Sequence, residues 1–454
     1  MPGPDGIHLG LRAYVRHAAH LYEHAPDHFE LMTVADVLAP LLLYLKLHPE
    51  PGGERLAARL LASLPGFHSP DLHYIGNRYP PAPRDTLCDL WYCFENGLIK
   101  YAWIALASGN SALAAIVLDG MRGASVLAER TNFCFPLFAD FGAAGGPTPT
   151  GSASNYSVAG LYAFGALLAA ELSGDPRERD AARHALAALR PLPAELMYHE
   201  PQQLAFGAAA AAILARDGDQ EMATLADRLA HAQVRMVYWH EDPYALAQGY
   251  RVRGLFQACA SLLDPAFKEE VEAILPWVVL LRDGLGPTEL LLKLLNLGRQ
   301  HSFAFFEPCL PGRAGHSACP FIPYENLGTT ELPETGTIGK EIYGAGEVFW
   351  LYLLFEALAR TNDPTICTIF LDLLEPATLA SFPPLQRRFM LYNPTAEARD
   401  FEVQFSHLAP GGYTLVTRPE GIFLPAEPTA LASGVPLRLE AHRWQEIELI
   451  PEGS

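Results

Sequence analysis

The chain of 454 residues has little charge for its length and lacks long uninterrupted apolar runs. Only 18% of its residues are charged and 50% are hydrophobic, which indicates a globular chain with a large core rather than a disordered one. Charged residues or glycine break the apolar runs, and the amino terminus has no charged start followed by an apolar stretch. We therefore expect neither a membrane span nor a secretion signal.

The sequence also lacks the short motifs of several enzyme classes. The glycines at 142–146 are not followed by the Lys-Ser/Thr of a phosphate-binding loop, and no Gly-x-Ser-x-Gly is present. A net charge of −19 disfavours binding to nucleic acid and to anionic membrane surfaces.

Cysteine is scarce and irregularly spaced. The seven cysteines are an odd number and lie mostly within apolar runs, which predicts reduced thiols in a cytoplasmic protein. His301, Cys309, His316 and Cys319 are residue types that bind zinc, but their spacing fits no compact zinc-finger pattern. The sequence thus predicts no metal or other cofactor, and leaves zinc binding in this segment open.

What the sequence does contain is a repeated break between helix-like runs. Gly or Asn suits the left-handed conformation past a helix end, Asp or Asn caps the next helix, and Pro suits its first position. The breaks are Ser108-Gly109-Asn110, Ser173-Gly174-Asp175-Pro176, Asp217-Gly218-Asp219, Leu263-Asp264-Pro265 and Thr361-Asn362-Asp363-Pro364, with a looser copy at 49–53. A period of roughly 45 residues predicts stacked or ring-closed helical hairpins.

Hydrophobic periodicity divides the chain into six such hairpins. The first arms are predicted at 33–48, 86–108, 155–173, 198–216, 243–263 and 339–361. The second arms are predicted at 53–64, 111–129, 176–190, 219–237, 265–283 and 364–375, with extra helices at 11–24 and 287–299. First arms are apolar on all sides and second arms are amphipathic, so we expect an inner and an outer ring.

Two long irregular segments and a change of pattern complete the organisation. Residues 131–154 and 300–337 are rich in aromatics, glycine and proline, and we expect ordered loops there, the second covering part of a site. After residue 380 the alternation in Phe401–Phe405 and Glu446–Ile450 predicts strands. We therefore expect a helical domain over 1–380 and an antiparallel β domain over 381–454.

A ring of six inner and six outer helices followed by a small β sandwich resembles the six-hairpin toroid, or (α/α)6 barrel, of carbohydrate-active enzymes. That superfamily includes glycoside hydrolases, polysaccharide lyases and sugar epimerases, and the β domain is more similar to the first two. The resemblance covers most of the chain but is architectural, because no family-specific catalytic motif accompanies it. It implies a mainly α fold and an enzyme that acts on an oligosaccharide.

Polar and aromatic residues gather at the starts of the predicted inner helices. Because inner helices of such a ring run in one direction, their starts meet at one end, which we call the mouth. The predicted substrate-binding residues are Trp91, Asn96, Tyr156, His199, Gln203, Trp239, His240, Tyr244, His301, Tyr324, Glu325 and Tyr343. Helix capping is the alternative explanation for the acids and amides, but it does not explain the recurring aromatics.

Hydrolysis of a glycosidic bond needs two carboxyl groups. The candidates are Glu95, Glu341, Glu200 and Glu241. Glu95 lies inside an apolar helix, where burial favours the protonated state that a general acid needs, although a structural carboxylate is the alternative. Glu341 lies in a glycine-rich helix start, which suggests close approach of a ligand or of another backbone.

Two other functions fit the same mouth. A lyase would use Tyr or His as a base and Arg251, Arg253, Arg299 or Lys340 to bind a uronate. A non-catalytic sugar-binding protein would need similar aromatics. Carboxylates outnumber basic groups at the mouth, so the sequence favours glycoside hydrolysis and leaves the substrate and the oligomeric state open.

Overall fold

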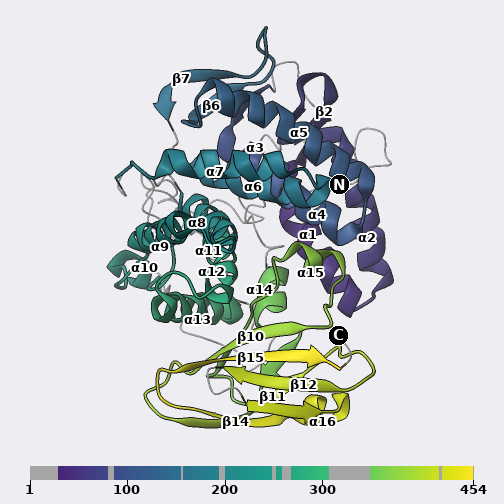
Figure 1. The fold of residues 1–454 in the computed structure, drawn as a ribbon, viewed down its shortest axis with the longest axis vertical. Coiled ribbons are helices and arrows are strands. Elements are labelled where there is room, and N and C mark those ends of the chain that lie inside the picture. The colour runs from purple at the N-terminus through teal and green to yellow at the C-terminus, as the bar shows by residue number, and fades with distance from the viewer. Residues whose placement is uncertain are drawn as a thin grey trace.

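The computed structural model describes residues 29–79, 86–154, 157–193, 200–247, 252–257, 267–305, 348–418 and 422–452. Helices form the upper part of the molecule in Figure 1, and two antiparallel sheets form the lower part. The predicted helix at 11–24 and most of the predicted loop at 300–337 lie outside the described residues.

The first four predicted hairpins are present. Their first arms are buried along most of their length, whereas their second arms bury one face. The pairs are α1 (Leu31–Leu47) with α2 (Pro51–Ser63); α3 (Leu90–Phe94), the π-helical segment η4 (Glu95–Lys100) and α4 (Tyr101–Ser108) with α5 (Ser111–Arg130); α6 (Val158–Ser173) with α7 (Pro176–Leu189); and α8 (Pro201–Ala215) with α9 (Gln220–Gln233).

The turns inside these hairpins have the predicted chemistry. Gly109 and Gly218 adopt φ values of 64° and 86°, where a side chain would be strained. The Asn110 side chain accepts hydrogen bonds from the first N–H groups of α5, and Asp219 does the same for α9. Local cap chemistry therefore explains where one arm ends and the next begins.

The fifth hairpin differs from the prediction. Its first arm was expected at 243–263, but α10 (Pro243–Ala247) is short, and Phe256 forms a β-bridge with Val237. The expected outer arm is instead a pair of helices with buried residues, α11 (Phe267–Ile274) and α12 (Trp277–Arg282), followed by α13 (Thr288–Phe305). As part of a second arm, this segment was expected to be amphipathic with its charged residues in water, yet Glu270 and Glu272 are buried.

The sixth hairpin is only half helical. Its first arm contains α14 (Val348–Phe355), but the second arm predicted at 364–375 is wrong, because β9 (Cys367–Phe370) lies there. The Asp363 carboxylate accepts hydrogen bonds from both the amide and the hydroxyl of Thr365, which closes a turn instead of capping a helix. All four residues of β9 are buried against the neighbouring strand.

The helices close into a ring. α1 packs against α4 on one side and against α14, from the far end of the helical part, on the other. α6 packs against α8, and α8 packs against α11. The ring predicted from the repeated turns is confirmed. Its fifth and sixth hairpins differ from the prediction, as described above.

Among the described residues, α5 is the one helix long and apolar enough to cross a membrane by length and composition. Its buried residues recur every three or four positions, as in Leu113, Val117, Met121 and Ala124. This spacing forms a single stripe, and α5 packs against α4 and α6. Packing on one face therefore accounts for its apolar residues.

Short paired strands precede α3. β5 (Leu87–Asp89) leads directly into that helix and pairs with β6 (Pro136–Asp140), which pairs with β7 (Thr148–Ser154). The segment predicted as an irregular loop at 131–154 therefore contains a hairpin. Two further pairs are β2 (His68–Ser69) with β3 (Tyr74–Ile75), and β1 (Phe29–Glu30) with β4 (Arg78–Tyr79).

The carboxyl-terminal part is a sandwich of two antiparallel sheets, and its strands begin at Ala359, before the predicted boundary at 380. Phe389 of one sheet contacts Phe405 of the other, with ring centroids 5.7 Å apart. One sheet has the order β13 (Ile422–Ala426), β12 (Tyr413–Arg418), β15 (Trp444–Pro451), β10 (Arg387–Tyr392) and β9; the other has β14 (Val435–Leu439), β11 (Arg399–Phe405) and β8 (Ala359–Thr361).

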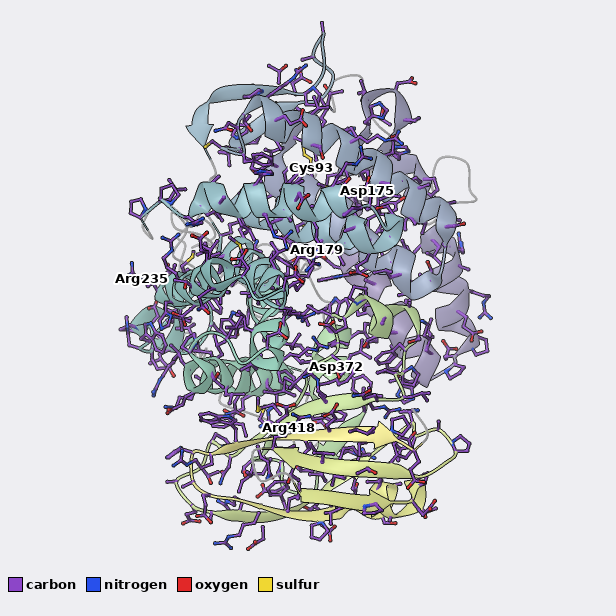
Figure 2. All side chains as sticks on the ribbon, in the orientation of Figure 1. Cys93, Asp175, Arg179, Arg235, Asp372 and Arg418 are labelled. Atoms are coloured by element: carbon purple, nitrogen blue, oxygen red, sulfur yellow. A yellow bond between two sulfur atoms is a disulfide. The ribbon has the colours of Figure 1, made fainter. Side chains whose placement is uncertain are left out.

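The sandwich lies at the end of the ring where inner helices stop. Lys46, in the last turn of α1, donates to the carbonyl of Leu379, and Arg216, just after α8, pairs with Glu375 at 2.8 Å. Asp372 lies between the two parts (Figure 2) and accepts from Arg282 of α12 at 2.9 Å. The mouth, where the inner helices begin, is therefore at the opposite end.

Candidate active site

Aromatic side chains from four inner helices meet inside the ring. Trp103 of α4 contacts Phe164 of α6, Phe206 of α8 and Trp350 of α14, with ring centroids 5.3–6.3 Å apart. All four side chains are buried. We call this set the aromatic floor, because it closes the interior of the ring below the polar residues described next.

Charged residues lie one helical turn closer to the mouth. Lys100 precedes Trp103 by three residues and so projects from the same face of the chain. Its ammonium group contacts the carboxylates of Asp36 from α1 and Glu272 from α11, and lies 3.5 Å from Oε1 of Glu95. These four side chains, the central charge cluster, are at most 3% exposed.

The π-helical segment η4 brings two members of this cluster together. In a π-helix the hydrogen bonds join residues five apart, and the Tyr101 N–H accordingly bonds to the Asn96 carbonyl. Glu95 and Lys100 are also five apart, so the segment places them on one face. Trp91, one turn before Glu95, donates its indole N–H to Oε2 of Glu95 at 2.5 Å.

Buried amides extend the polar layer. Gln203 precedes Phe206 by three residues on α8, so it lies one turn above the aromatic floor. Its side chain is buried, and neither amide atom has a hydrogen-bond partner among the described residues. The Asn96 side chain is also buried and donates to the Tyr92 carbonyl at 3.2 Å. Polar groups thus occupy the mouth side of the ring interior.

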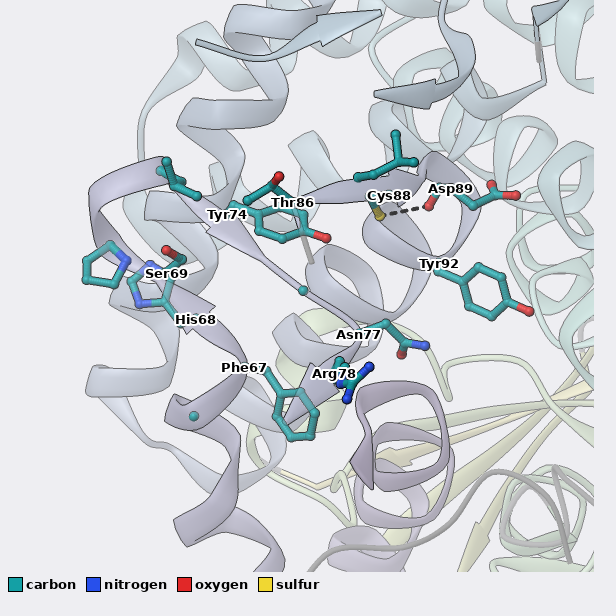
Figure 3. Close-up of a pocket in the computed structure, with 15 residues that line it drawn as sticks. Phe67, His68, Ser69, Tyr74, Asn77, Arg78, Thr86, Cys88, Asp89 and Tyr92 are labelled. Atoms are coloured by element: carbon teal, nitrogen blue, oxygen red, sulfur yellow. Dashed lines mark hydrogen bonds between the residues drawn. The ribbon is translucent and has the colours of Figure 1, made fainter. Parts of the chain in front are cut away.

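A cavity of about 450 Å³ opens beside the start of α3 (Figure 3). Its walls come from the segments that join α2 to α3 and from α3 itself, and they include Phe67, His68, Tyr74, Arg78 and Tyr92. Tyr92 links the cavity to the ring interior, because the centroid of its ring lies 4.1 Å from that of Trp91. The cavity therefore adjoins the helix that carries Glu95.

Asp89 is the carboxyl group on this cavity's wall among the described residues. It is the N-cap of α3 and accepts a hydrogen bond from the Trp91 amide at 3.1 Å. Burial raises the pKa of Asp89 to about 6, against the weaker opposing effect of that hydrogen bond. With this pKa, about half of Asp89 is protonated at pH 6 and about a tenth at pH 7, so it can donate a proton in mildly acidic solution.

Cys88 and Cys93 flank Asp89 and form a disulfide. Their Cα atoms are 6.5 Å apart because the chain bends from β5 into α3 between them. The expectation of seven reduced thiols is therefore wrong for this pair, whereas Cys134 and Cys367 are free.

The predicted site residues fall into three groups. Trp91, Glu95, Asn96 and Gln203 are all buried, and Trp91 and Glu95 contact each other. Tyr244 belongs to α10 and His301 to α13, but their side chains lie outside the description. Outside the described residues altogether are Tyr156, His199, Tyr324, Glu325, Glu341 and Tyr343.

The remaining candidates have local partners or face solvent. Glu200 accepts from the Gln202 amide at 2.6 Å at the start of α8, and Glu241 accepts from the Val252 amide at 3.0 Å. Trp239 is 50% exposed, and His240 is exposed beside it.

Two other sequence expectations concern cations. Arg299, a proposed uronate ligand, is buried and donates to the Asn296 side chain at 2.9 Å and to the Pro364 carbonyl, near the sandwich. Among the described residues, no group of three His, Cys, Asp or Glu side chains could hold a metal ion. Cys309, His316 and Cys319 lie outside the described residues, as does the side chain of His301, so zinc binding there stays open.

Sequence reasoning missed Asp36, Lys100, Glu272 and the cavity role of Asp89. A usable signal existed for the first two, because each is a lone charge inside an otherwise apolar helical run. Such a charge must find a partner inside the fold. Glu272 carried no such signal, since its helix is rich in acidic residues.

The sequence matches no protein-family model and no curated protein sequence. Among solved structures, a family 76 glycoside hydrolase from a bovine Bacteroides thetaiotaomicron strain is 11% identical and has a TM-score of 0.52, over 78% of this chain and 73% of its own. A sugar epimerase from a ruminal bacterium is 10% identical with a TM-score of 0.48, over 78% and 93% of the two chains. A D-mannose isomerase is 10% identical with the same TM-score, over 75% and 89%. The chain therefore has the (α/α)6 toroid fold found in carbohydrate-active enzymes, followed by a small antiparallel β sandwich.

Proposed function

We propose that the chain is a carbohydrate-active enzyme that hydrolyses a glycosidic bond in an oligosaccharide, bound at the mouth of the toroid. One observation carries the proposal: Asp89, with a pKa of about 6, lines a cavity of about 450 Å³ at the start of an inner helix. Cavities of about 300–1,000 Å³ are typical of small-molecule sites.

The lining of the cavity suits a sugar. Tyr92 and Phe67 offer aromatic surface for the apolar faces of a sugar ring, and Ser69, Thr86 and Arg78 offer polar groups for its hydroxyls. The Tyr74 ring is held in place by stacking on Phe141, with centroids 4.6 Å apart. Such a wall can orient a glycosidic oxygen toward the Asp89 carboxyl group.

Asp89 would act as the general acid, giving its proton to the leaving-group oxygen as the bond to the anomeric carbon breaks. Hydrolysis then needs a second carboxyl, to activate water or to attack the sugar directly. We propose Glu95 or Glu341 for that role. Glu95 follows Asp89 on the same inner helix, whereas Glu341 comes from the sequence prediction alone.

The test begins with a panel of neutral and uronate-containing oligosaccharides, digested by the purified chain and analysed by chromatography. On any substrate found, Asp89→Asn should lower kcat about 10²–10⁴-fold, because asparagine still caps the helix but donates no carboxyl proton. Asp219→Asn is the matched control, since Asp219 caps an outer helix in the same way. Wild-type turnover in Asp89→Asn would reject Asp89 as the acid.

Glu95→Gln separates two roles for Glu95. A catalytic Glu95 predicts a large loss of kcat with little change in melting temperature. A purely structural Glu95 predicts a lower melting temperature and nearly unchanged turnover in the folded fraction.

Arg78 supports a second candidate function, β-elimination on a uronate. It lines the same cavity as Asp89, Tyr92 and His68, so its guanidinium could neutralise a uronate carboxylate while Tyr92 or His68 removes the α-proton. Elimination leaves a carbon–carbon double bond in the product, detectable by ultraviolet absorbance, whereas hydrolysis does not. Binding without any product would instead identify a sugar-binding protein.

A further inference from the structure

A second cavity, of about 420 Å³, lies on the β sandwich. Its walls come from β8, from β11 and the turn that follows it, and from the short helix α16 (Pro428–Ser433). The polar side chains that line it are Arg360, Gln404, Ser406, His407 and Thr429.

The cavity is basic in a strongly acidic protein. Arg360 and Gln404 lie directly opposite each other on antiparallel strands, so their side chains project from the same face of the sheet. The Arg360 guanidinium is exposed and forms no hydrogen bond or ion pair with the described residues. None of the described residues that line the cavity is a carboxylate.

A buried arginine fixes the wall that contains Ser406 and His407. Arg387 is 1% exposed and donates hydrogen bonds to the carbonyls of Ser406, at 2.6 Å, and of His407 and Pro384. Burial lowers the pKa of Arg387 to about 10, which still leaves it charged at neutral pH. Its guanidinium faces backbone carbonyls and does not line the cavity, so its role is to hold Ser406 and His407 in one conformation.

The His407 ring completes this wall. It packs edge-on against His48 of the helical part, with centroids 5.4 Å apart. Burial, with help from His48 and Arg387, lowers the pKa of His407, so the ring is neutral at physiological pH. A neutral imidazole can accept or donate one hydrogen bond to a hydroxyl group.

We propose that this cavity binds a carboxylate-bearing sugar, such as a uronate residue of an oligosaccharide, at a site separate from the mouth. Arg360 would form the paired hydrogen bonds that a guanidinium makes with a carboxylate, while Gln404 and Thr429 contact the hydroxyls. The sugar class rests on the proposed function. The anionic character of the ligand rests on the cavity itself, where the Arg360 guanidinium is exposed and no described lining residue is acidic.

The position of the cavity makes it an accessory site. The sandwich lies at the end of the ring where α1 and α8 stop, whereas Asp89 and its cavity lie where α3 begins. A sugar bound here would therefore hold a longer oligosaccharide to the enzyme without reaching the reacting bond.

The test is a calorimetric titration of the full chain with a uronate trisaccharide and with a neutral trisaccharide of the same linkage. Arg360→Gln should weaken uronate binding at this site about ten- to a hundredfold, because a charge-assisted pair is lost. Arg438→Gln is the matched control, an exposed arginine on β14 of the same sandwich that pairs with Asp400 at 3.1 Å. It should bind as the wild type does.

Two further results separate this site from the mouth. Asp89→Asn should keep the Arg360-dependent binding, and Arg360→Gln should keep wild-type kcat on short substrates. Equal uronate affinity in Arg360→Gln and Arg438→Gln, or equal affinity of the wild type for uronate and neutral sugars, would overturn the accessory site. If the wild type turned over none of the oligosaccharides but kept its Arg360-dependent uronate binding, that result would count only against the proposed hydrolysis.

Discussion

Replacing Lys100 with methionine tests whether the central charge cluster holds the ring together. The ammonium group of Lys100 contacts carboxylates from α1 and α11 and lies 3.5 Å from a third on its own helix. Breaking one buried ion pair by removing a partner typically costs about 3–5 kcal/mol, because a buried charge loses its compensation. Since three carboxylates converge on Lys100, we expect a loss at or above the upper end of that range at pH 8.

The loss should depend on pH in a defined direction. A carboxylate left buried without a cation takes up a proton more readily, so the deficit of Lys100→Met should shrink between pH 8 and pH 5. Thermal unfolding followed by circular dichroism at both pH values measures it. Adding Glu272→Gln to the variant should recover part of the loss at pH 8, because one buried carboxylate is removed.

Lys293→Met is the control for removing a lysine as such. Lys293 pairs with Glu289 at 2.6 Å on the exposed side of α13, where such a pair contributes only about 0.3–0.5 kcal/mol. If Lys100→Met melts within about a degree of this control at pH 8, or if its deficit is the same at pH 5, the charge cluster does not hold the ring together in this way.

Three further predictions concern groups whose pKa is shifted. At pH 8, Asp89→Asn should raise the free energy of unfolding by about 1–2 kcal/mol, after allowance for the partial exposure of Asp89. The gain should be small at pH 4, because the raised pKa of Asp89 costs stability only as the pH rises from about 4 to 6. Burial raises the pKa of Glu270 to about 8, and a glutamine at this position can still accept the hydrogen bond from the Phe256 amide. Glu270→Gln should therefore stabilise the fold by roughly 3 kcal/mol at pH 7.5 and not at pH 4. Destabilisation at pH 7.5 would contradict this prediction. The pKa of His407 is lowered in the folded chain, so the unfolded chain takes up a proton first as the pH falls below about 6.5, and the wild type loses stability. His407→Gln lacks this group and should lose less stability than the wild type between pH 7 and pH 5 in thermal melts.

The parts of the fold that follow from local chemistry could be predicted from the sequence. Gly109 with Asn110, and Gly218 with Asp219, mark helix ends because their conformations and caps depend on neighbouring residues only. Asp363 has the same residue type in a similar break, yet it closes a turn before a strand. The difference comes from β9 pairing with β10, a contact between distant segments that a local pattern does not contain.

The candidate site also combines features set by local spacing with contacts between distant segments. The polarity of the inner-helix starts predicted that Trp91, Glu95 and Gln203 belong to one site, which stays a prediction. All three side chains are buried, because helical spacing fixes which residues share a face. The ion pairs of Lys100 with Asp36 and Glu272 join three helices far apart in sequence. No spacing rule links such residues, so their partners were visible only in the folded ring.

The π-helical segment explains how one inner helix serves both the polar layer and the aromatic floor. Trp91 and Glu95 are four apart and share a face, as do Lys100 and Trp103, which are three apart. In an uninterrupted α-helix each residue turns by about 100°, so Glu95 and Lys100 would point about 140° apart. The two pairs could not then both face the ring interior. The wider turn of η4 absorbs that difference, so the Trp91–Glu95 contact and the Lys100 contacts point the same way. Such segments cost helix regularity and often occur at functional sites, which is a further reason to place the chemistry of this chain at the mouth end of α3.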